Sequence, residues 1–170
     1  LFVNQLMMNL NRQRLLYPSL SRRRWVWDSD EIRDMEIPEN VAVFITKSFD
    51  RLPLDVLSAL CVLSCFGKSV DVHLIHLLEI EIQIPLIDPL HIAVTESVLG
   101  KRNGDKEFYF LHDKLQEAAY SMIQPEICPL QHFRYGLAIG QVAVREEDDK
   151  LLITAVEQMN LGGPKACVDG

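Results

Sequence analysis

Positive charge is scarce in this sequence. Its 170 residues include 17 Lys and Arg against 24 Asp and Glu, which gives a formal net charge of -7 and a pI near 5.2. Between Lys68 and Lys101 there is no Lys or Arg, whereas five residues are acidic: Asp71, Glu79, Glu81, Asp88 and Glu96. Because nucleic acids and anionic membranes attract basic surfaces, the sequence predicts neither as a partner.

Long apolar runs and export signals are also missing. The longest apolar region, residues 54–67, is interrupted by polar residues and is too short to cross a bilayer. Neither the basic start nor the small-residue cleavage site of a secretion signal is present. Of the four cysteines, Cys61 and Cys65 lie in one apolar run, whereas Cys128 and Cys167 are isolated. This pattern favours buried thiols over a metal site or disulfides, and we expect a cytoplasmic protein.

No complete catalytic motif is visible, so we expect this segment to have no catalytic residues of its own. Gly67-Lys68-Ser69 imitates the end of a phosphate-binding loop, but Val62 stands where that loop requires an earlier glycine. The spacing of His73, His76 and Glu79 would suit metal ligands on one helix face. No convincing fourth ligand accompanies them, so surface or half-buried histidines are the favoured interpretation and no metal site is predicted.

Hydrophobic periodicity predicts a mainly helical chain. We expect helices over residues 1–16, 38–52, 52–67, 69–81 and 88–96, with a short strand at 24–28. Asn103-Gly104 is a strong signal for a β-hairpin, because both central residues of a type I′ turn need positive φ. Three to four helices followed by a hairpin are the order of a winged-helix module. Further helices over 114–123, 129–144 and 150–160 indicate α-solenoid-like helical hairpins.

The stretch Glu107–Ile123 changes from alternating to helical spacing at His112 and Asp113. Asp113 is a good N-cap with Gln116 three residues later, as in a capping box. Leu115, Ala118, Ala119 and Met122 then form an apolar stripe. Capping by Asp113 leaves His112 without a structural role.

Several stretches, in this order, resemble one family: "LFVNQLMMNL", "RWVWD", "IPENVAVFITKSFDRLP", "VLSALCVLSCFG", "FYFLHDKLQEAAYSMI", "HFRYGLAIG" and "AVEQMNLG". They are similar to the signal-transducing P-loop ATPases with numerous domains, the STAND class. The likeness is strongest to the ATPase region of multi-sensor histidine kinases and their serine/threonine kinase-like relatives. The resemblance implies a lid helix and short strand at 1–37, a winged helix at 38–123, and the start of a TPR-like repeat region at 124–170. We therefore expect an excised segment, with the nucleotide-binding core before Leu1.

The "HD" of "FLHD" resembles the histidine-aspartate motif of related switch ATPases, in which the histidine contacts the diphosphate. By this resemblance, His112 is the candidate ADP-phosphate sensor and Asp113 the helix cap that supports it. ATP or ADP, with magnesium, would bind in the missing core, and the partners would be that core and the neighbouring sensor or kinase domains. The expected role is a regulatory lid and relay. The alternatives are a protein-interaction winged helix without nucleotide contact and, third, a DNA-binding regulator.

Overall fold

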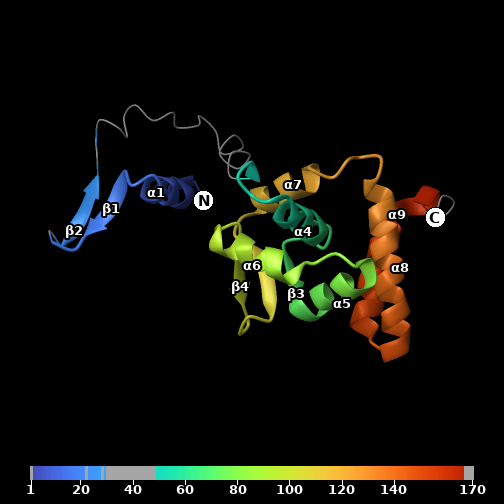
Figure 1. The fold of residues 1–170 in the computed structure, drawn as a ribbon. Helices are drawn as coiled ribbons and strands as arrows, with labels where there is room; N and C mark the ends of the chain where they lie inside the picture. The colour runs from blue at the N-terminus through green and yellow to red at the C-terminus, as the bar shows by residue number, and fades with distance from the viewer. Residues whose placement is uncertain (1, 22, 28, 30–48, 167–170) are drawn as a thin grey trace. The chain divides into compact units, whose positions relative to one another are not determined.

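The computed structural model describes residues 2–21, 23–27, 29 and 49–166 (Figure 1). The chain divides into two compact units, residues 1–50 and 51–170. The predicted helix over 38–52 and the predicted boundary at 37/38 lie largely outside the described residues. The other predicted boundary, at 123/124, falls in a connection between two helices of the second unit.

The first unit contains helix α1 (Phe2–Arg12) and strands β1 (Leu16–Ser19) and β2 (Arg24–Trp27). The strands pair antiparallel, from Leu16 opposite Trp27 to Ser19 opposite Arg24. The predicted helix and the predicted strand are thus confirmed, although the helix ends four residues early. Trp25 and Trp27 share one face of the hairpin, as their alternation predicts, and both are exposed.

The second unit starts with three helices and three strands. They are α4 (Leu54–Ser64), β3 (Ser69–Asp71), α5 (Val72–Ile82), α6 (Ile87–Thr95), β4 (Leu99–Arg102) and β5 (Glu107–Phe110). The strands form an antiparallel sheet in the order β3-β5-β4 (Figure 1). The described residues are therefore mainly helical with small antiparallel sheets. The sequence predicted the helices and the hairpin of this unit, but it did not predict β3.

Helix α4 is the centre of the core, as its apolar residues predict. Val56, Ala59 and Leu60 are inaccessible to solvent, and the helix packs against α6 and α7 (Asp113–Ser121). Strand β5 adds Phe108 and Phe110, whose side chains are buried while the intervening Tyr109 is half-buried. Burying such side chains contributes roughly 1.5–3 kcal/mol each, so this cluster holds β5 firmly in place.

The β4–β5 turn is longer than the predicted two-residue turn. Arg102 is opposite Glu107, which leaves a four-residue loop. Asn103, Gly104 and Asp105 all have positive φ. A bidentate contact from Arg102 to Glu107, at 2.6 and 2.7 Å, fixes the base of the loop and lowers the pKa of Glu107 to about 2.

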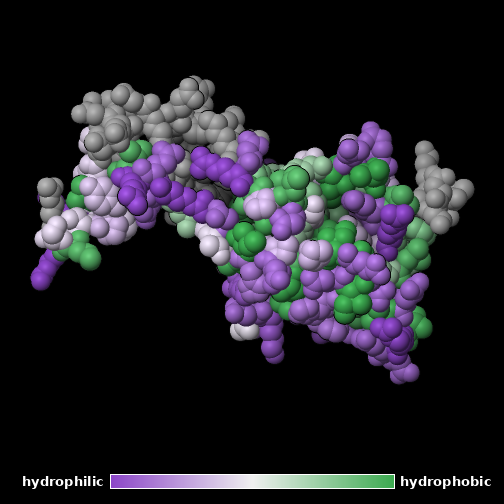
Figure 2. All heavy atoms as spheres, viewed as in Figure 1, coloured by the Kyte–Doolittle hydropathy of each residue, from purple (hydrophilic) through white to green (hydrophobic). Residues whose placement is uncertain are grey.

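Two long helices, α8 (Cys128–Glu146) and α9 (Asp149–Ala166), form the predicted helical hairpin. Their backbones approach closely at Gly136, where an added Cβ would lie 2.8 Å from the carbonyl oxygen of Ala155. Helix α9 extends beyond the predicted end at Asn160 and changes direction at Gly163, whose φ is +69°. Figure 2 shows hydrophobic and hydrophilic residues interspersed on the visible face of the second unit.

Among the described residues, none of the helices combines the length and the apolar character needed to cross a membrane.

Candidate functional site

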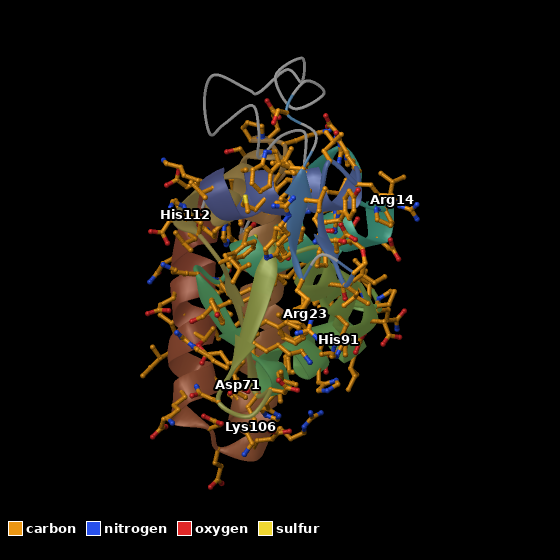
Figure 3. All side chains as sticks on the ribbon, turned by 90° about the vertical axis from the view of Figure 1, so that its left-hand side faces the viewer. Arg14, Arg23, Asp71, His91, Lys106 and His112 are labelled. Atoms are coloured by element: carbon orange, nitrogen blue, oxygen red, sulfur yellow. The ribbon has the colours of Figure 1, made fainter. Side chains whose placement is uncertain are left out.

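The candidate site lies where β5 ends and α7 begins. The Phe110 N–H donates to the carbonyl oxygen of Lys68 at 2.9 Å, and the Leu111 N–H donates to that of Val98 at 3.2 Å. His112 is still extended, with φ -153° and ψ 147°, and α7 starts at the next residue. The sheet therefore fixes the position of His112. In Figure 3, His112 lies at the opposite end of the sheet from Asp71 and Lys106.

The N-cap of α7 is His112, and the prediction that Asp113 caps this helix is wrong. His112 Nδ1 accepts a hydrogen bond from the backbone N–H of Lys114 at 3.1 Å. Its carbonyl oxygen accepts from the N–H of Leu115 at 3.0 Å. The physical reason is the backbone: an N-cap residue needs extended dihedrals, and the strand supplies them at His112 rather than one residue later.

Asp113 lies instead in the first turn of α7 and forms an ion pair with Lys68, with 2.7 Å between Asp113 Oδ1 and Lys68 Nζ. The hydrogen bond and charge of Lys68 lower the pKa of Asp113 below its ordinary value. The helix N-terminus also favours this carboxylate. Asp113 thus supports α7 electrostatically, although it does not cap it.

Gln116 does not reach back to complete the predicted capping box. Its side-chain Nε2 donates to the carbonyl oxygen of Ser64 at 2.8 Å, at the end of α4. Leu115 and Ala119 are buried as predicted, whereas Met122 is exposed. Helix α7 is therefore attached to α4 through both an apolar stripe and a glutamine amide.

The cap determines which nitrogen of His112 carries the proton. Since Nδ1 accepts a hydrogen bond from Lys114, it carries a lone pair, and the proton of the neutral ring is on Nε2. Among the described residues, Nε2 has no hydrogen-bond partner, and the side chain is only half-buried. His112 can therefore donate one hydrogen bond to a group outside this unit while it continues to cap α7.

Lys68 belongs to the sequence that imitates a phosphate-binding loop. The structure places it after α4 and before β3, with Gly67 at φ +92° in the turn. A phosphate-binding loop needs the opposite order, strand before loop and helix after it. The resemblance of this stretch to such a loop is thus coincidental. The Lys68 ammonium group nevertheless lies beside the His112 junction, since it contacts Asp113.

The three spaced residues on α5 do not converge on one point: His76 and Glu79 lie beside each other, whereas His73 lies beside Glu146 of α8. Glu79 Oε1 accepts from the backbone N–H of Leu86 at 2.7 Å, at the start of α6. His76 lies 3.6 Å from Glu79, and His73 lies 4.0 Å from Glu146. Within the described parts of the chain, no group of three or more His, Cys, Asp or Glu residues could hold a metal ion.

A buried polar chain was not predicted from the sequence. His132 Nε2 lies 2.9 Å from the Tyr120 hydroxyl, and His132 Nδ1 lies 2.7 Å from Gln158 Oε1. Gln158 Nε2 donates to the carbonyl oxygen of Cys65 at 3.0 Å. The sequence held one signal: His132 lies on the same helical stripe as the apolar Tyr135 and Ile139. The partner Gln158 is 26 residues away and could not be read from that spacing.

Comparison of the chain with protein-family models, with curated proteins and with solved structures gave no match.

Proposed function

We propose that this chain is a regulatory lid and relay segment of a signal-transducing ATPase of the STAND class. It would couple the ADP or ATP state of a nucleotide-binding core to neighbouring sensor or kinase domains in a cytoplasmic protein. The observation that carries the proposal is the geometry of His112, whose Nδ1 accepts the capping hydrogen bond while Nε2 has no hydrogen-bond partner among the described residues. The segment itself has no catalytic role in the proposal.

The order of elements in residues 49–123, the described part of 38–123, supports a winged-helix interpretation of that range. Helix, strand, helix, helix, strand, strand, with the last strand central in the sheet, is the arrangement expected of such a module. The β4–β5 hairpin would be its wing. Helices α8 and α9 would then begin the TPR-like repeat region, and residues 1–37 would contribute the lid helix and strand.

The chemistry of the junction suits a phosphate oxygen. A neutral imidazole donates through Nε2, and the first turn of α7 adds backbone N–H groups and the positive end of the helix dipole. The Lys68 ammonium lies in the same neighbourhood through its contact with Asp113. Asp113 is anionic, so in the proposal it faces Lys68 and remains separate from the phosphate.

A second candidate, a winged helix that only binds protein, shares this fold and differs in making no use of Nε2. A DNA-binding regulator is less well supported. The third helix of the module is α6, and its exposed side chains include Asp88, His91 and Ile92 but no Lys or Arg. Phosphate contacts supply most non-specific affinity for DNA, so this face offers little for DNA binding.

The test is calorimetric titration of ADP into the intact parent protein and two His112 variants. His112→Ala removes both the cap and the donor. His112→Asn keeps a capping oxygen but removes the imidazole Nε2–H. Both variants should bind ADP more weakly by about 1 to 3 kcal/mol, the usual scale for a hydrogen bond to a charged group.

The matched control is Lys106→Ala, because Lys106 lies at the far end of the sheet from His112 (Figure 3). Lys101 is a poorer control, since its ammonium lies 5.3 Å from the centre of the buried Phe108 ring. Lys106→Ala should bind ADP as the unsubstituted protein does. If His112→Asn also binds ADP normally, the histidine is only a helix cap, and the protein-interaction alternative takes the place of this proposal.

A further inference from the structure

A second feature of the unit 51–170 is an open pocket of about 650 Å³, where the end of α4 meets α7, α8 and α9. Residues 64–67 form one wall, and Gln116 and Tyr120 come from α7. His132 comes from α8, and Glu157 and Asn160 come from α9. This volume lies within the roughly 300–1,000 Å³ of small-molecule pockets.

A chain of hydrogen bonds orders the side chains in the buried part of the pocket. Gln158 uses its amide N–H group for the Cys65 carbonyl, so its Oε1 must accept from His132 Nδ1. His132 Nε2 lies 2.9 Å from the Tyr120 hydroxyl, whose oxygen accepts from the Cys128 thiol at 3.2 Å. The hydrogen bond with Cys128, followed by burial, raises the pKa of Tyr120 to about 12. These bonds hold the His132 ring in one orientation.

The charges at the pocket have one sign. None of the residues that line it is Lys or Arg, and Glu157 supplies an exposed carboxylate. Helix α4 ends here at Ser64, so the negative end of its dipole faces the same space. Lys68, one residue beyond the wall, is paired with Asp113. An anion such as a nucleotide phosphate would find no cation in this lining.

Two aromatic rings complete the lining. Phe66 is half-buried and packs against Tyr135, with 5.7 Å between the ring centres, and Tyr120 lies on the α7 side. Aromatic faces attract organic cations, and each such contact is worth roughly 0.5–2 kcal/mol depending on desolvation. A carboxylate, a helix C-terminus and aromatic rings together favour a positively charged ligand with an apolar body.

We propose that this pocket binds a small organic cation, an amine attached to an aromatic or aliphatic group. The ammonium group lies between Glu157 and the end of α4, and the apolar body lies against Phe66 and Tyr120. The site is separate from the His112 junction and does not depend on the proposed nucleotide contact. Bound ligand would contact α4, α7 and α9 together, and so would stabilise their packing.

The experiment uses the complete 170-residue chain and three probes of matched shape: 2-phenylethylammonium, neutral 2-phenylethanol and anionic phenylacetate. Binding is measured from chemical-shift changes of the backbone amides during titration. The ammonium probe should bind at least about fivefold more tightly than the alcohol, since one favourable ion contact is worth about 1 kcal/mol. Phenylacetate should bind more weakly than both.

The key variant is Glu157→Gln, which keeps the shape and removes the charge at an exposed position, where such a substitution changes stability little. It should reduce ammonium binding about three- to fivefold and leave alcohol binding unchanged. Glu126→Gln, an exposed carboxylate outside the pocket lining, is the control and should bind all three probes as the unsubstituted chain does. Equal affinity for ammonium and alcohol, an unchanged preference in Glu157→Gln, or the absence of saturable ammonium binding would each overturn the proposal.

Discussion

Two histidines of the second unit use their rings in different ways. His132 is 2% exposed, and both its nitrogens have partners, the Tyr120 hydroxyl and the Gln158 carbonyl oxygen. His112 is half-buried, and within the described part of the chain only Nδ1 has a hydrogen-bond partner, the backbone N–H of Lys114. A fully paired and buried ring holds helices together. A ring with one nitrogen committed and the other accessible keeps a defined orientation and can still recognise a ligand.

The difference follows from where the neighbouring elements place each ring. Three helices, α7, α8 and α9, surround His132, and the carbonyl of Cys65 anchors its partner Gln158. His112 follows the end of a strand, and the one hydrogen bond to its ring from a described residue comes from the next helix. Substitutions of the two histidines should therefore lower the stability of the protein by different amounts. Comparing these losses tests the roles assigned to the two rings.

The largest effect is expected for His132→Ala. The substitution leaves the Tyr120 hydroxyl and Gln158 Oε1 without their partner and opens a cavity in the core. The free energy of unfolding should fall by about 3 kcal/mol, because buried unpaired polar groups cost about 1–3 kcal/mol each. Urea unfolding followed by circular dichroism measures the change.

The control for that substitution is His73→Ala. His73 is exposed, and its nearest carboxylate, on Glu146, is 4.0 Å away. Its unfolding free energy should change by less than about 0.5 kcal/mol. If His132→Ala proved as mild as His73→Ala, the buried chain of hydrogen bonds would not stabilise the packing of α7, α8 and α9.

A smaller effect is expected at His112, and it depends on the replacement. His112→Ala removes the N-cap of α7 and should cost about 1 kcal/mol of stability, whereas His112→Asn supplies another capping acceptor and should cost close to nothing. Thermal unfolding of both variants checks this. Equal losses would mean that packing of the ring, rather than the Nδ1 hydrogen bond, accounts for its structural role. If the Nδ1 hydrogen bond accounts for the structural role, His112→Asn should keep its stability and lose only ADP affinity.

The sequence predicted those features whose causes are local. Apolar periodicity located α4, α5 and the α8–α9 hairpin, and Asn103-Gly104 located the β4–β5 turn. The N-cap of α5 is equally local, since the Asp71 side chain accepts from the His73 N–H at 2.7 Å. In each case the deciding residues are neighbours in sequence.

The features that escaped prediction have distant causes. Strand β3 has only three residues and is extended because it pairs with β5, from Ser69 opposite Tyr109 to Asp71 opposite Glu107. Asp113 has a strong intrinsic preference for the cap position, but pairing of β5 with distant segments keeps His112 extended and moves the cap one residue earlier. The partner of Gln116, the Ser64 carbonyl, is 52 residues away.

The smallest effect in the comparison is expected for Asp113→Asn, because its ion pair with Lys68 is exposed on both sides and solvent screens it. Lys68 lowers the folded-state pKa of Asp113, so the folded protein binds that proton less readily than the unfolded chain does. The contribution to stability is therefore present above about pH 4, the ordinary range of an aspartate, and is lost as the pH falls below it. Asp113→Asn should lower the melting temperature slightly at pH 7 and less at about pH 3, and added salt should reduce the difference at pH 7.

Asp88→Asn is the matched control, since Asp88 also lies in the first turn of a helix but has no ion pair with a described residue. If Asp113→Asn lowers the melting temperature no more than Asp88→Asn does, the helix dipole accounts for the whole effect. The ion pair would then contribute nothing to stability, and Lys68 could bind a ligand beside His112.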